Sequence, residues 1–243
     1  MKILISQKQP TNLNAYTALE EKYGAKSEFV PFFRIEPLSA KEFRAQRINL
    51  PDYTAIVFSS RYAIDAYFKL CEEMRFKVPE TMKYFCSTEL VALYLQKHVV
   101  YRKRKIFFGD GTPQSVAALV GPKHKGEKFL VTTSDESSSS PLASHFIKAG
   151  LDCTVSAMVK SVPQDLSGLK LSDYSAVVLY SPYDLKSLDA SFPDFEQGEL
   201  DIIAYGKGIA AALEEKGLKI AVKAPSAEIQ SAARAIEEYL KTR

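Results

Sequence analysis

Two short apolar runs along the chain each end in hydroxyl residues and pass into a helical pattern. Residues 55–58 read Ala-Ile-Val-Phe and residues 176–179 read Ala-Val-Val-Leu. Such a run, followed by polar residues at helical spacing, predicts a buried strand, a turn and the start of a helix. Aligned from Asp52 and from Asp173, six of thirteen residues are identical, and both copies end in Ser-x-Tyr. The two segments therefore indicate an internal repeat.

Further matches extend this repeat to most of the chain. Residues 2–7 predict a strand, residues 12–23 predict a helix that ends at Gly24, and residues 27–35 predict a second strand. The same order of strand, loop, helix and strand recurs in the second half. Three positions recur 126 residues later: Lys2 and Lys128, Gly24 and Gly150, and Pro37 and Pro163. We therefore expect two similar halves, joined near residues 121–126.

Strands and helices also alternate in the rest of each half. A strand at residues 84–88 precedes a helix through residues 90–95, and residues 202–209 precede a helix over residues 210–216. This alternation predicts an α/β fold with parallel sheets covered on both faces. Right-handed crossovers bring the carboxyl ends of parallel strands to one edge. At that edge the sequence places a set of mostly hydroxyl-bearing residues: Gln7, Ser59, Ser60, Ser87, Thr88, Ser134, Ser181 and Gly206.

The carboxyl edge of such a sheet is the expected ligand site, because free backbone N–H groups point outwards where helices begin. Gly206-Lys207-Gly208 fits an anion cradle there, and it fits a tight strand-to-helix turn equally well. It is not a dinucleotide-binding fingerprint, because the third glycine and the later acidic residue are missing. Both interpretations of this segment remain open at the level of sequence.

The serine-rich segment 134–141 has two interpretations as well. It could form a recognition loop lined by hydroxyl groups. We favour a loop that ends in an N-cap at Ser140, with Pro141 as the first residue of a helix over residues 141–148.

Composition narrows the class of protein. The chain has 243 residues, of which 46% are hydrophobic and 25% are charged, enough for two domains with cores of their own. A net charge of +3 is too small to indicate a nucleic-acid-binding protein. The basic run 101–105 is a solvated edge in the interpretation we favour, and an anion patch or nucleic-acid contact in the weaker one.

Other features argue against secretion, membrane insertion and metal binding. No signal-peptide pattern and no apolar run of membrane-spanning length is present, so a cytoplasmic protein is expected. The cysteines are odd in number and lack a C-x-x-C motif: Cys71, Cys86 and Cys153. His98, His124 and His145 share no metal-ligand spacing and are expected at the surface. We therefore expect no metal site.

Four segments, in order, resemble motifs of the uroporphyrinogen-III synthase family over nearly the whole chain. Residues 57–64 match the family's hydrophobic-Phe-Thr-Ser run, and residues 179–182 match its Phe-Ser-Pro. Residues 204–217 match its Ile-Gly-Pro-Thr-Thr-Ala segment with the helix and glycine that follow, and residues 224–226 match its Pro-Thr before the last helix. Each motif is short, so the order and spacing carry the resemblance.

The resemblance implies two similar parallel-sheet α/β domains, joined by a two-strand linker, with a cleft between them. Residues 1–35 with 161–243 would form one domain, and residues 36–160 the other. The implied reaction cyclises hydroxymethylbilane, a linear tetrapyrrole that carries carboxylates, with loss of water and inversion of the last pyrrole ring. No cofactor is implied, and a monomer without nucleic-acid or membrane partners is expected.

The residues expected to contact substrate lie at the strand ends: Ser60, Ser87, Thr88, Ser181, Tyr183, Gly206, Lys207 and Ser226. No catalytic residue can be named. Family positions that usually carry Thr, Tyr and Arg hold Ile209, Val159 and Gln7 here, whereas Lys207 adds a positive charge. Two hypotheses therefore stand, a cyclising hydro-lyase and a family member that binds a tetrapyrrole or another polyanion without turnover.

Overall fold

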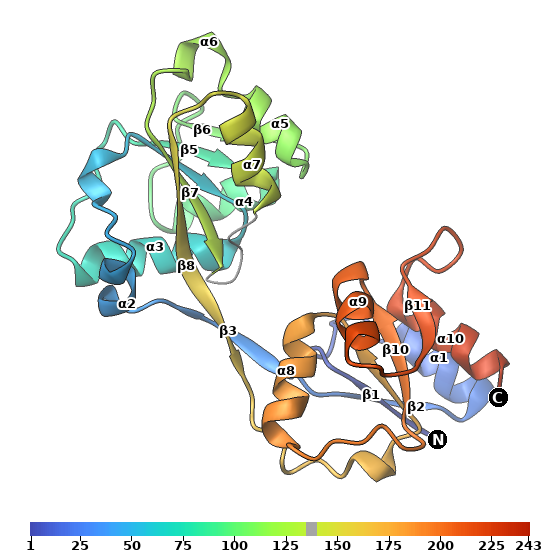
Figure 1. Ribbon diagram of the computed structural model, residues 1–243. Helices are drawn as coiled ribbons and strands as arrows, with labels where there is room; N and C mark the ends of the chain where they lie inside the picture. The colour runs from blue at the N-terminus through green and yellow to red at the C-terminus, as the bar shows by residue number, and fades with distance from the viewer. Residues whose placement is uncertain (135–139) are drawn as a thin grey trace. The chain divides into compact units, whose positions relative to one another are not determined.

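A computed structural model describes residues 1–134 and 140–243, which divide into two compact units (Figure 1). Unit 1 comprises residues 1–34 and 162–243, and unit 2 comprises residues 35–161. The chain passes between the units twice, within strands β3 (Phe33–Pro37) and β8 (Cys153–Pro163). We propose that the units are the two domains expected from the sequence.

Unit 1 is built on a five-stranded parallel sheet with the order β11-β10-β9-β1-β2. Its strands are β1 (Lys2–Ile5), β2 (Lys26–Phe29), β9 (Ala176–Leu179), β10 (Asp201–Tyr205) and β11 (Ile220–Ala224). The strand β9 is buried at all four positions. A central parallel strand covered on both faces has this uniformly apolar pattern.

Helices cover both faces of the unit 1 sheet (Figure 1). They are α1 (Asn14–Tyr23), α8 (Pro182–Ser191), α9 (Lys207–Glu215) and α10 (Ala232–Lys241), with a 3₁₀ turn at Leu171–Asp173. Leu4 joins the core under α8 and α9, whereas Ile3 and Ile5 join the core under α1 and α10. Successive side chains of a strand point to opposite faces, so β1 contributes to both cores.

Unit 2 contains a six-stranded sheet with the order β3-β8-β7-β4-β5-β6. The remaining strands are β4 (Ala55–Phe58), β5 (Lys83–Cys86), β6 (Ile106–Phe108) and β7 (Phe129–Ser134). The pairs from β8 to β6 are parallel. The carboxyl ends of β4, β5 and β7 therefore lie along one edge.

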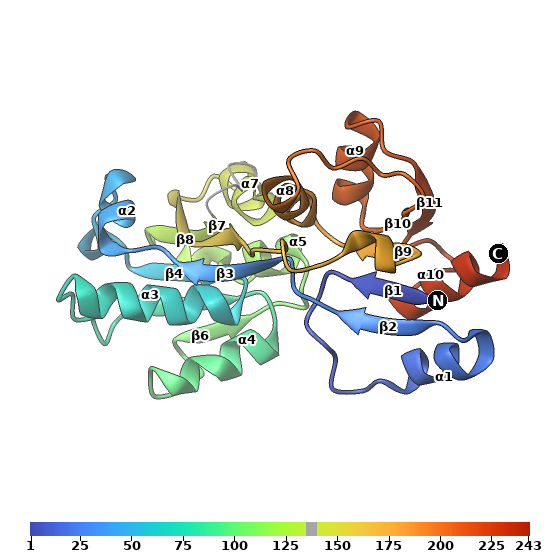
Figure 2. The same cartoon turned by 90° about the horizontal axis from the view of Figure 1, so that it is seen from below.

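The helices of unit 2 likewise form two cores on its sheet (Figure 2). They are α2 (Ala40–Ala45), α3 (Arg61–Glu73), α4 (Glu89–Tyr94), α5 (Pro113–Ala118), α6 (Gly121–His124) and α7 (Pro141–Lys148), with 3₁₀ turns at Leu50–Asp52 and Leu95–Lys97. Tyr67 of α3 packs with Phe58 in one core, and Phe146 of α7 packs with Phe129 in the other. Within the described residues, no helix combines the length and apolar character needed to span a membrane.

The two sheets repeat the same register, which confirms the predicted fold class. Ile3 of β1 lies opposite Ala176 of β9, and Phe129 of β7 lies opposite Ala55 of β4. Each pair contains residues that the internal repeat aligns. The register therefore makes four positions of unit 1 equivalent to four of unit 2: Ser6 to Thr132, Tyr180 to Ser59, Ser181 to Ser60, and Asp184 to Ala63.

The prediction of one strand over residues 27–35 is wrong. The segment forms β2 and β3, which belong to different sheets. The Val30 N–H donates to the Ile5 carbonyl at 3.0 Å, and Pro31 follows directly. Proline fixes its own φ and restricts the backbone of the residue before it, so Pro31 marks the point where the chain leaves this sheet.

The prediction that all histidines lie at the surface is wrong for His124, which is only 5% exposed. Its ring packs against Phe85 and Phe107, with centroid distances of 5.7 and 4.8 Å. Burial lowers the pKa of this imidazole, and the nearby Lys83 ammonium adds to the effect. The short helix α6 turns His124 inwards, which its sequence spacing did not reveal.

Candidate functional site

In unit 2 the predicted hydroxyl residues cap helices at the carboxyl edge of the sheet. Ser60 precedes α3, and its Oγ accepts the N–H of Ala63 at 3.2 Å. Thr88 precedes α4, and its Oγ1 accepts the N–H of Val91 at 3.3 Å. N-cap hydroxyls satisfy amides that the helix itself leaves unpaired. These side chains therefore have a structural role whether or not they also bind a ligand.

A pocket of about 410 Å³ opens at this edge, entirely within unit 2. The N-caps of three helices border it, namely Ser60 of α3, Thr112 of α5 and Ser140 of α7. Helix N-termini carry partial positive charge, which attracts anionic groups. At the start of α5 the Asp110 carboxylate already accepts from the Thr112 N–H at 2.9 Å, so the starts of α3 and α7 are the two that favour an anionic ligand. Its lining combines hydroxyl and apolar groups, and those used below are Ser59, Ser60, Ala63, Ser87, Thr132, Thr133 and Val159.

The structure brings Ser60 and Ser87 together in this pocket, whereas Thr88 lines a neighbouring hollow. The Ser87 hydroxyl donates to the Ser59 carbonyl at 3.1 Å and so ties the ends of β4 and β5. The hollow has a volume of about 610 Å³ and includes Phe108 and Asp110 among its lining residues. Of the unit 2 residues expected to contact substrate, Ser60 and Ser87 therefore share one cavity.

The N-cap that we favoured for the serine-rich segment is confirmed. Ser140 Oγ accepts the N–H of Ala143 at 3.4 Å, and Pro141 is the first residue of α7. The alternative, a recognition loop, concerns mainly residues 135–139, which lie outside the described residues.

In unit 1 the edge holds Ser181 and Tyr183 at the start of α8. Ser181 Oγ accepts the N–H of Tyr183 at 3.2 Å. The Tyr183 ring packs near Phe33, with centroids 5.5 Å apart, and Lys186 Nζ lies 4.9 Å from its centroid. A ring with a cation at its face is held in place by packing and by cation–π attraction. Contact of either residue with a ligand stays a prediction.

Gly206 is required by close packing between neighbouring strand ends. Its φ is 145°, and a Cβ atom there would lie 3.1 Å from the Tyr180 carbonyl oxygen. Its N–H donates to the Ala224 carbonyl at 2.6 Å. These contacts support the tight-turn interpretation of Gly206-Lys207-Gly208. Lys207 is exposed at the first residue of α9, so its ammonium group can still meet a ligand.

Ser226 lies in the loop after β11. Its Oγ accepts the Ile229 N–H at 3.1 Å, and its own N–H donates to the Ile229 carbonyl at 3.0 Å. The side chain is exposed and stabilises a turn. Its contact with a ligand stays a prediction.

The three positions that depart from the family pattern have different environments. Ile209 is fully buried in the core of unit 1, where its side chain packs with other apolar groups. Val159 lines the unit 2 pocket and is 8% exposed. Gln7 is exposed just beyond β1. Of the three, Val159 is the one that places an apolar surface in a described pocket.

Asp184 of α8 is a buried carboxylate that the sequence analysis did not select. It is 0% exposed, and its Oδ2 accepts hydrogen bonds from Ser6 Oγ at 2.7 Å, Tyr180 N at 2.7 Å and Ser181 N at 3.0 Å. Burial raises the pKa of this carboxyl group, and the hydrogen bonds partly oppose the rise. Its spacing from Ser181 matches a capping box, which is the one sequence signal that could have revealed it.

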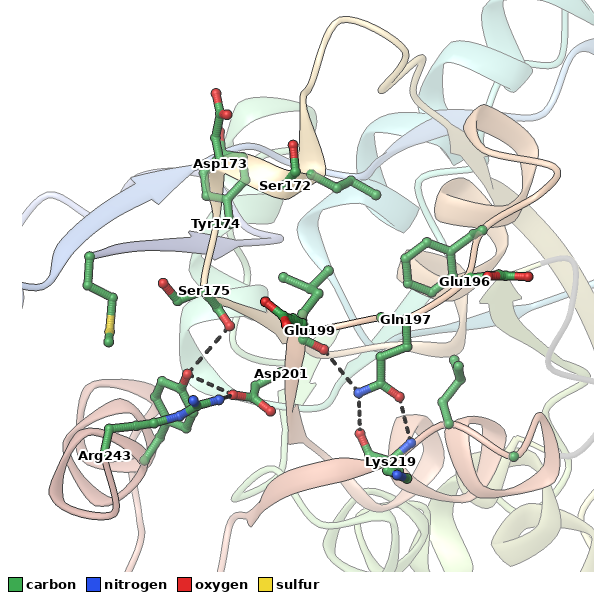
Figure 3. Close-up of a pocket in the computed structure, with 18 residues that line it drawn as sticks. Ser172, Asp173, Tyr174, Ser175, Glu196, Gln197, Glu199, Asp201, Lys219 and Arg243 are labelled. Atoms are coloured by element: carbon green, nitrogen blue, oxygen red, sulfur yellow. Dashed lines mark hydrogen bonds and ion pairs between the residues drawn. The ribbon is translucent and has the colours of Figure 1, made fainter.

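A larger pocket, of about 1200 Å³, lies at the opposite end of the unit 1 strands (Figure 3). Three of its polar side chains, Gln197, Asp201 and Arg243, bind one another or the backbone. Gln197 contacts the backbone N–H and carbonyl of Lys219, and Asp201 accepts from the Tyr239 hydroxyl at 2.9 Å and pairs with Arg243. These contacts fasten the C-terminal helix to the start of β10. They give Gln197, Asp201 and Arg243 a structural role there.

The described part of the chain contains no cluster of three or more His, Cys, Asp or Glu side chains that could hold a metal ion. The candidate site residues described above offer hydroxyls, backbone amides, helix N-termini and the Lys207 ammonium group.

Comparison with known proteins gives a consistent picture. The sequence matches the model of the family described as uroporphyrinogen-III synthase HemD over residues 14–234. No curated protein matches the chain significantly.

Solved structures resemble the chain over its full length. One is uroporphyrinogen-III synthetase from Helicobacter pylori, with 16% identity, a TM-score of 0.60, and coverage of 100% of this chain and 99% of that chain. Another is a mutant uroporphyrinogen III synthase from Thermus thermophilus, with 15% identity, a TM-score of 0.52 and complete coverage of both chains. At these identities the likeness establishes the fold alone.

Proposed function

Because the chain belongs to the uroporphyrinogen-III synthase family, we propose that it is a hydro-lyase that cyclises hydroxymethylbilane. The substrate would lose water, invert its last pyrrole ring and close to uroporphyrinogen III. The observation that carries this proposal is the family match over residues 14–234, which includes the carboxyl ends of strands β2 to β11.

The chemistry asks the protein to position its substrate more than to supply a strong acid or a metal. Loss of the hydroxyl group generates a stabilised cation, and a folded substrate then closes its ring. Oriented N–H and hydroxyl donors would hold the substrate carboxylates in the geometry that leads to the inverted ring. The unit 2 pocket supports this role, because the N-termini of α3 and α7 at its border favour anionic groups.

The proposed substrate contacts are the eight residues expected from the sequence. Ser60 and Ser87 share the unit 2 pocket, and Thr88 lies in the adjacent hollow. From unit 1, Lys207 would attract a carboxylate as a point charge. The other proposed contacts are Ser181, Tyr183, Gly206 and Ser226. We further propose a monomeric cytoplasmic protein that needs no cofactor.

The second candidate function is binding of a tetrapyrrole or another polyanion without turnover. It is favoured by Val159, which places an apolar side chain in the pocket where the family usually carries a tyrosine. The buried Ile209 likewise supplies no donor to either strand edge.

Incubation of the purified protein with freshly prepared hydroxymethylbilane tests the proposed activity. The fraction of type III isomer among the ring products is measured by chromatography after oxidation to porphyrins. An active enzyme yields mainly type III, whereas spontaneous closure yields the uninverted type I isomer. A product that is type I alone contradicts the hydro-lyase.

A binding titration then separates the two candidates. Quenching of intrinsic tyrosine fluorescence by uroporphyrin III reports binding without turnover. Saturable binding together with type I product supports the second candidate, and absence of binding and turnover contradicts both.

A further inference from the structure

Equivalent residues meet at one place in both units. In unit 2, Thr132, Ser59, Ser60 and Ala63 line the pocket of about 410 Å³. The repeat and its strand register place four residues of unit 1 at the same positions: Ser6, Tyr180, Ser181 and Asp184. A carboxylate therefore stands in unit 1 where unit 2 has a methyl group and a cavity.

The surroundings of Asp184 are those of a bound carboxylate. One hydroxyl and two backbone amides converge on a single oxygen, with donor distances between 2.7 and 3.0 Å. The hydroxyl comes from Ser6, which is 178 residues away in sequence and lies at the end of β1. The second oxygen, Oδ1, is buried without a hydrogen-bond partner among the described residues. A local helix cap requires neither a distant hydroxyl nor full burial.

Unit 2 keeps similar groups but lacks the internal carboxylate. Ala63 ends in a methyl group, which cannot accept a hydrogen bond from the amides of Ser59 and Ser60. Thr132 Oγ1 donates to the Val57 carbonyl at 2.7 Å, whereas the equivalent Ser6 donates to Asp184. The space that the Asp184 side chain takes up in unit 1 is thus part of an open pocket in unit 2.

We propose that Asp184 is an internal ligand, which fills in unit 1 the carboxylate site that unit 2 leaves open. The edge between β1 and β9 is then closed to a carboxylate from outside. Anionic groups of a substrate would bind in the unit 2 pocket and at Lys207 instead. This last step rests on the proposed function, whereas the filling of the unit 1 site does not.

Chemical rescue tests the proposal. Asp184→Ala removes the carboxylate and leaves the Ser6 hydroxyl and the Tyr180 and Ser181 amides without their acceptor. Loss of the acceptor for the buried Ser6 hydroxyl and the two partly buried amides should lower Tm by roughly 5 °C or more. Formate or acetate should refill the hole and restore at least about half of that loss in a saturable manner, because a ligand bound only to the folded state stabilises it. Sodium chloride at equal ionic strength should not.

Two control variants separate a carboxylate site from packing alone. Asp184→Leu fills the space with an apolar side chain and should lose stability without rescue by formate. Asp189→Ala removes an exposed carboxylate of the same helix, which pairs with Lys216, and should show no formate effect. Rescue of Asp184→Ala alone supports the proposal. Equal gains in all three proteins, or no gain in Asp184→Ala, overturn it.

If Asp184→Ala does not fold, a second variant tests the proposal. Asp184→Ser leaves a smaller hole, and samples of it are refolded in the presence of formate or of chloride. Recovery of folded protein in formate alone supports the site, and two variants that stay unfolded in formate contradict it. Because the readout is stability, a wild-type protein without cyclising activity would not affect this result.

Discussion

At the carboxyl end of β4, Ala63 borders a pocket of about 410 Å³, whereas at the carboxyl end of β9 the equivalent Asp184 is fully buried under hydrogen bonds. Both places are built by the same strand, turn and helix, with a serine N-cap at Ser60 or Ser181. The comparison teaches that one side chain decides whether a duplicated strand edge is open to a ligand or occupied by the protein itself.

A second difference concerns charge. The register of β5 and β10 makes Glu89, the first residue of α4, equivalent to Lys207, the first residue of α9. A carboxylate at a helix N-terminus lowers its attraction for anions, and an ammonium group raises it. We therefore expect the edge of unit 1 to attract an anion through the Lys207 ammonium group, and the edge of unit 2 to bind one through amides and hydroxyls.

The largest effect is expected when unit 2 receives the residue that closes unit 1. Ala63→Asp should place a carboxylate against the Ser59 and Ser60 amides, and so occupy the pocket and repel the substrate. We expect turnover of hydroxymethylbilane to fall on the order of 100-fold, with little change in Tm. Initial rates and thermal denaturation are measured on the same preparation.

Ala15→Asp is the matched control, because Ala15 is exposed in the first turn of α1 and lines no described pocket. This variant should keep the wild-type rate. Full activity in Ala63→Asp would show that the pocket does not bind the substrate.

Charge at the two helix starts should have a smaller effect. Lys207→Gln should raise KM about three- to tenfold, because it removes a point charge that attracts substrate carboxylates in solvent. The increase should shrink at high salt, since screening already weakens the wild-type attraction. Glu89→Gln should leave KM unchanged or lower it. An equal change in KM for both substitutions would contradict the proposal that the two helix starts attract anions differently.

The pattern of the chain predicted most of the fold because local signals agreed with one another. The apolar run before Ser60 and the Pro141 start of α7 both combine periodicity with a cap, and each element formed where these signals met. The break between β2 and β3 was missed because the apolar run continues across Pro31. There, the backbone restraint of one proline outweighed the strand pattern.

The site was predicted less well, for a physical reason. Ser60 and Ser87 could be placed together because parallel strands end at a common edge. Asp184 was missed, because its capping-box spacing from Ser181 marks only a helix cap, and its hydrogen bond with Ser6, 178 residues away, appears only in the fold. The sequence alone does not distinguish an aspartate that faces solvent from one that is buried in a site.

The smallest expected effect is on stability as a function of pH. Burial raises the pKa of Asp184 above 3.8, so its contribution to stability is present below that value and is lost as pH rises through the folded-state pKa. In unit 2, burial of Asp65 raises its pKa, but hydrogen bonds from Tyr94, Lys97 and His98 outweigh it and lower the pKa to about 2. That contribution is lost as pH falls below 3.8.

The two asparagine variants should therefore change the pH profile in opposite directions. Tm is measured between about pH 6 and pH 2 for the wild type and both variants. As pH falls, the Tm of the wild type relative to Asp65→Asn should decrease. Its Tm relative to Asp184→Asn should increase. Parallel profiles would contradict the difference between the two carboxylates.

The most direct test of the account is backbone amide chemical-shift mapping of the 27.1 kDa protein during titration with uroporphyrin III. We expect the largest changes at the unit 2 pocket, at Ser60, Ser87 and Thr133. The chemical shifts of the Ser6 and Tyr180 amides, which lie beside the Asp184 carboxylate, should stay unchanged. Changes at Ser6 and Tyr180 that match or exceed those of the pocket would contradict the account.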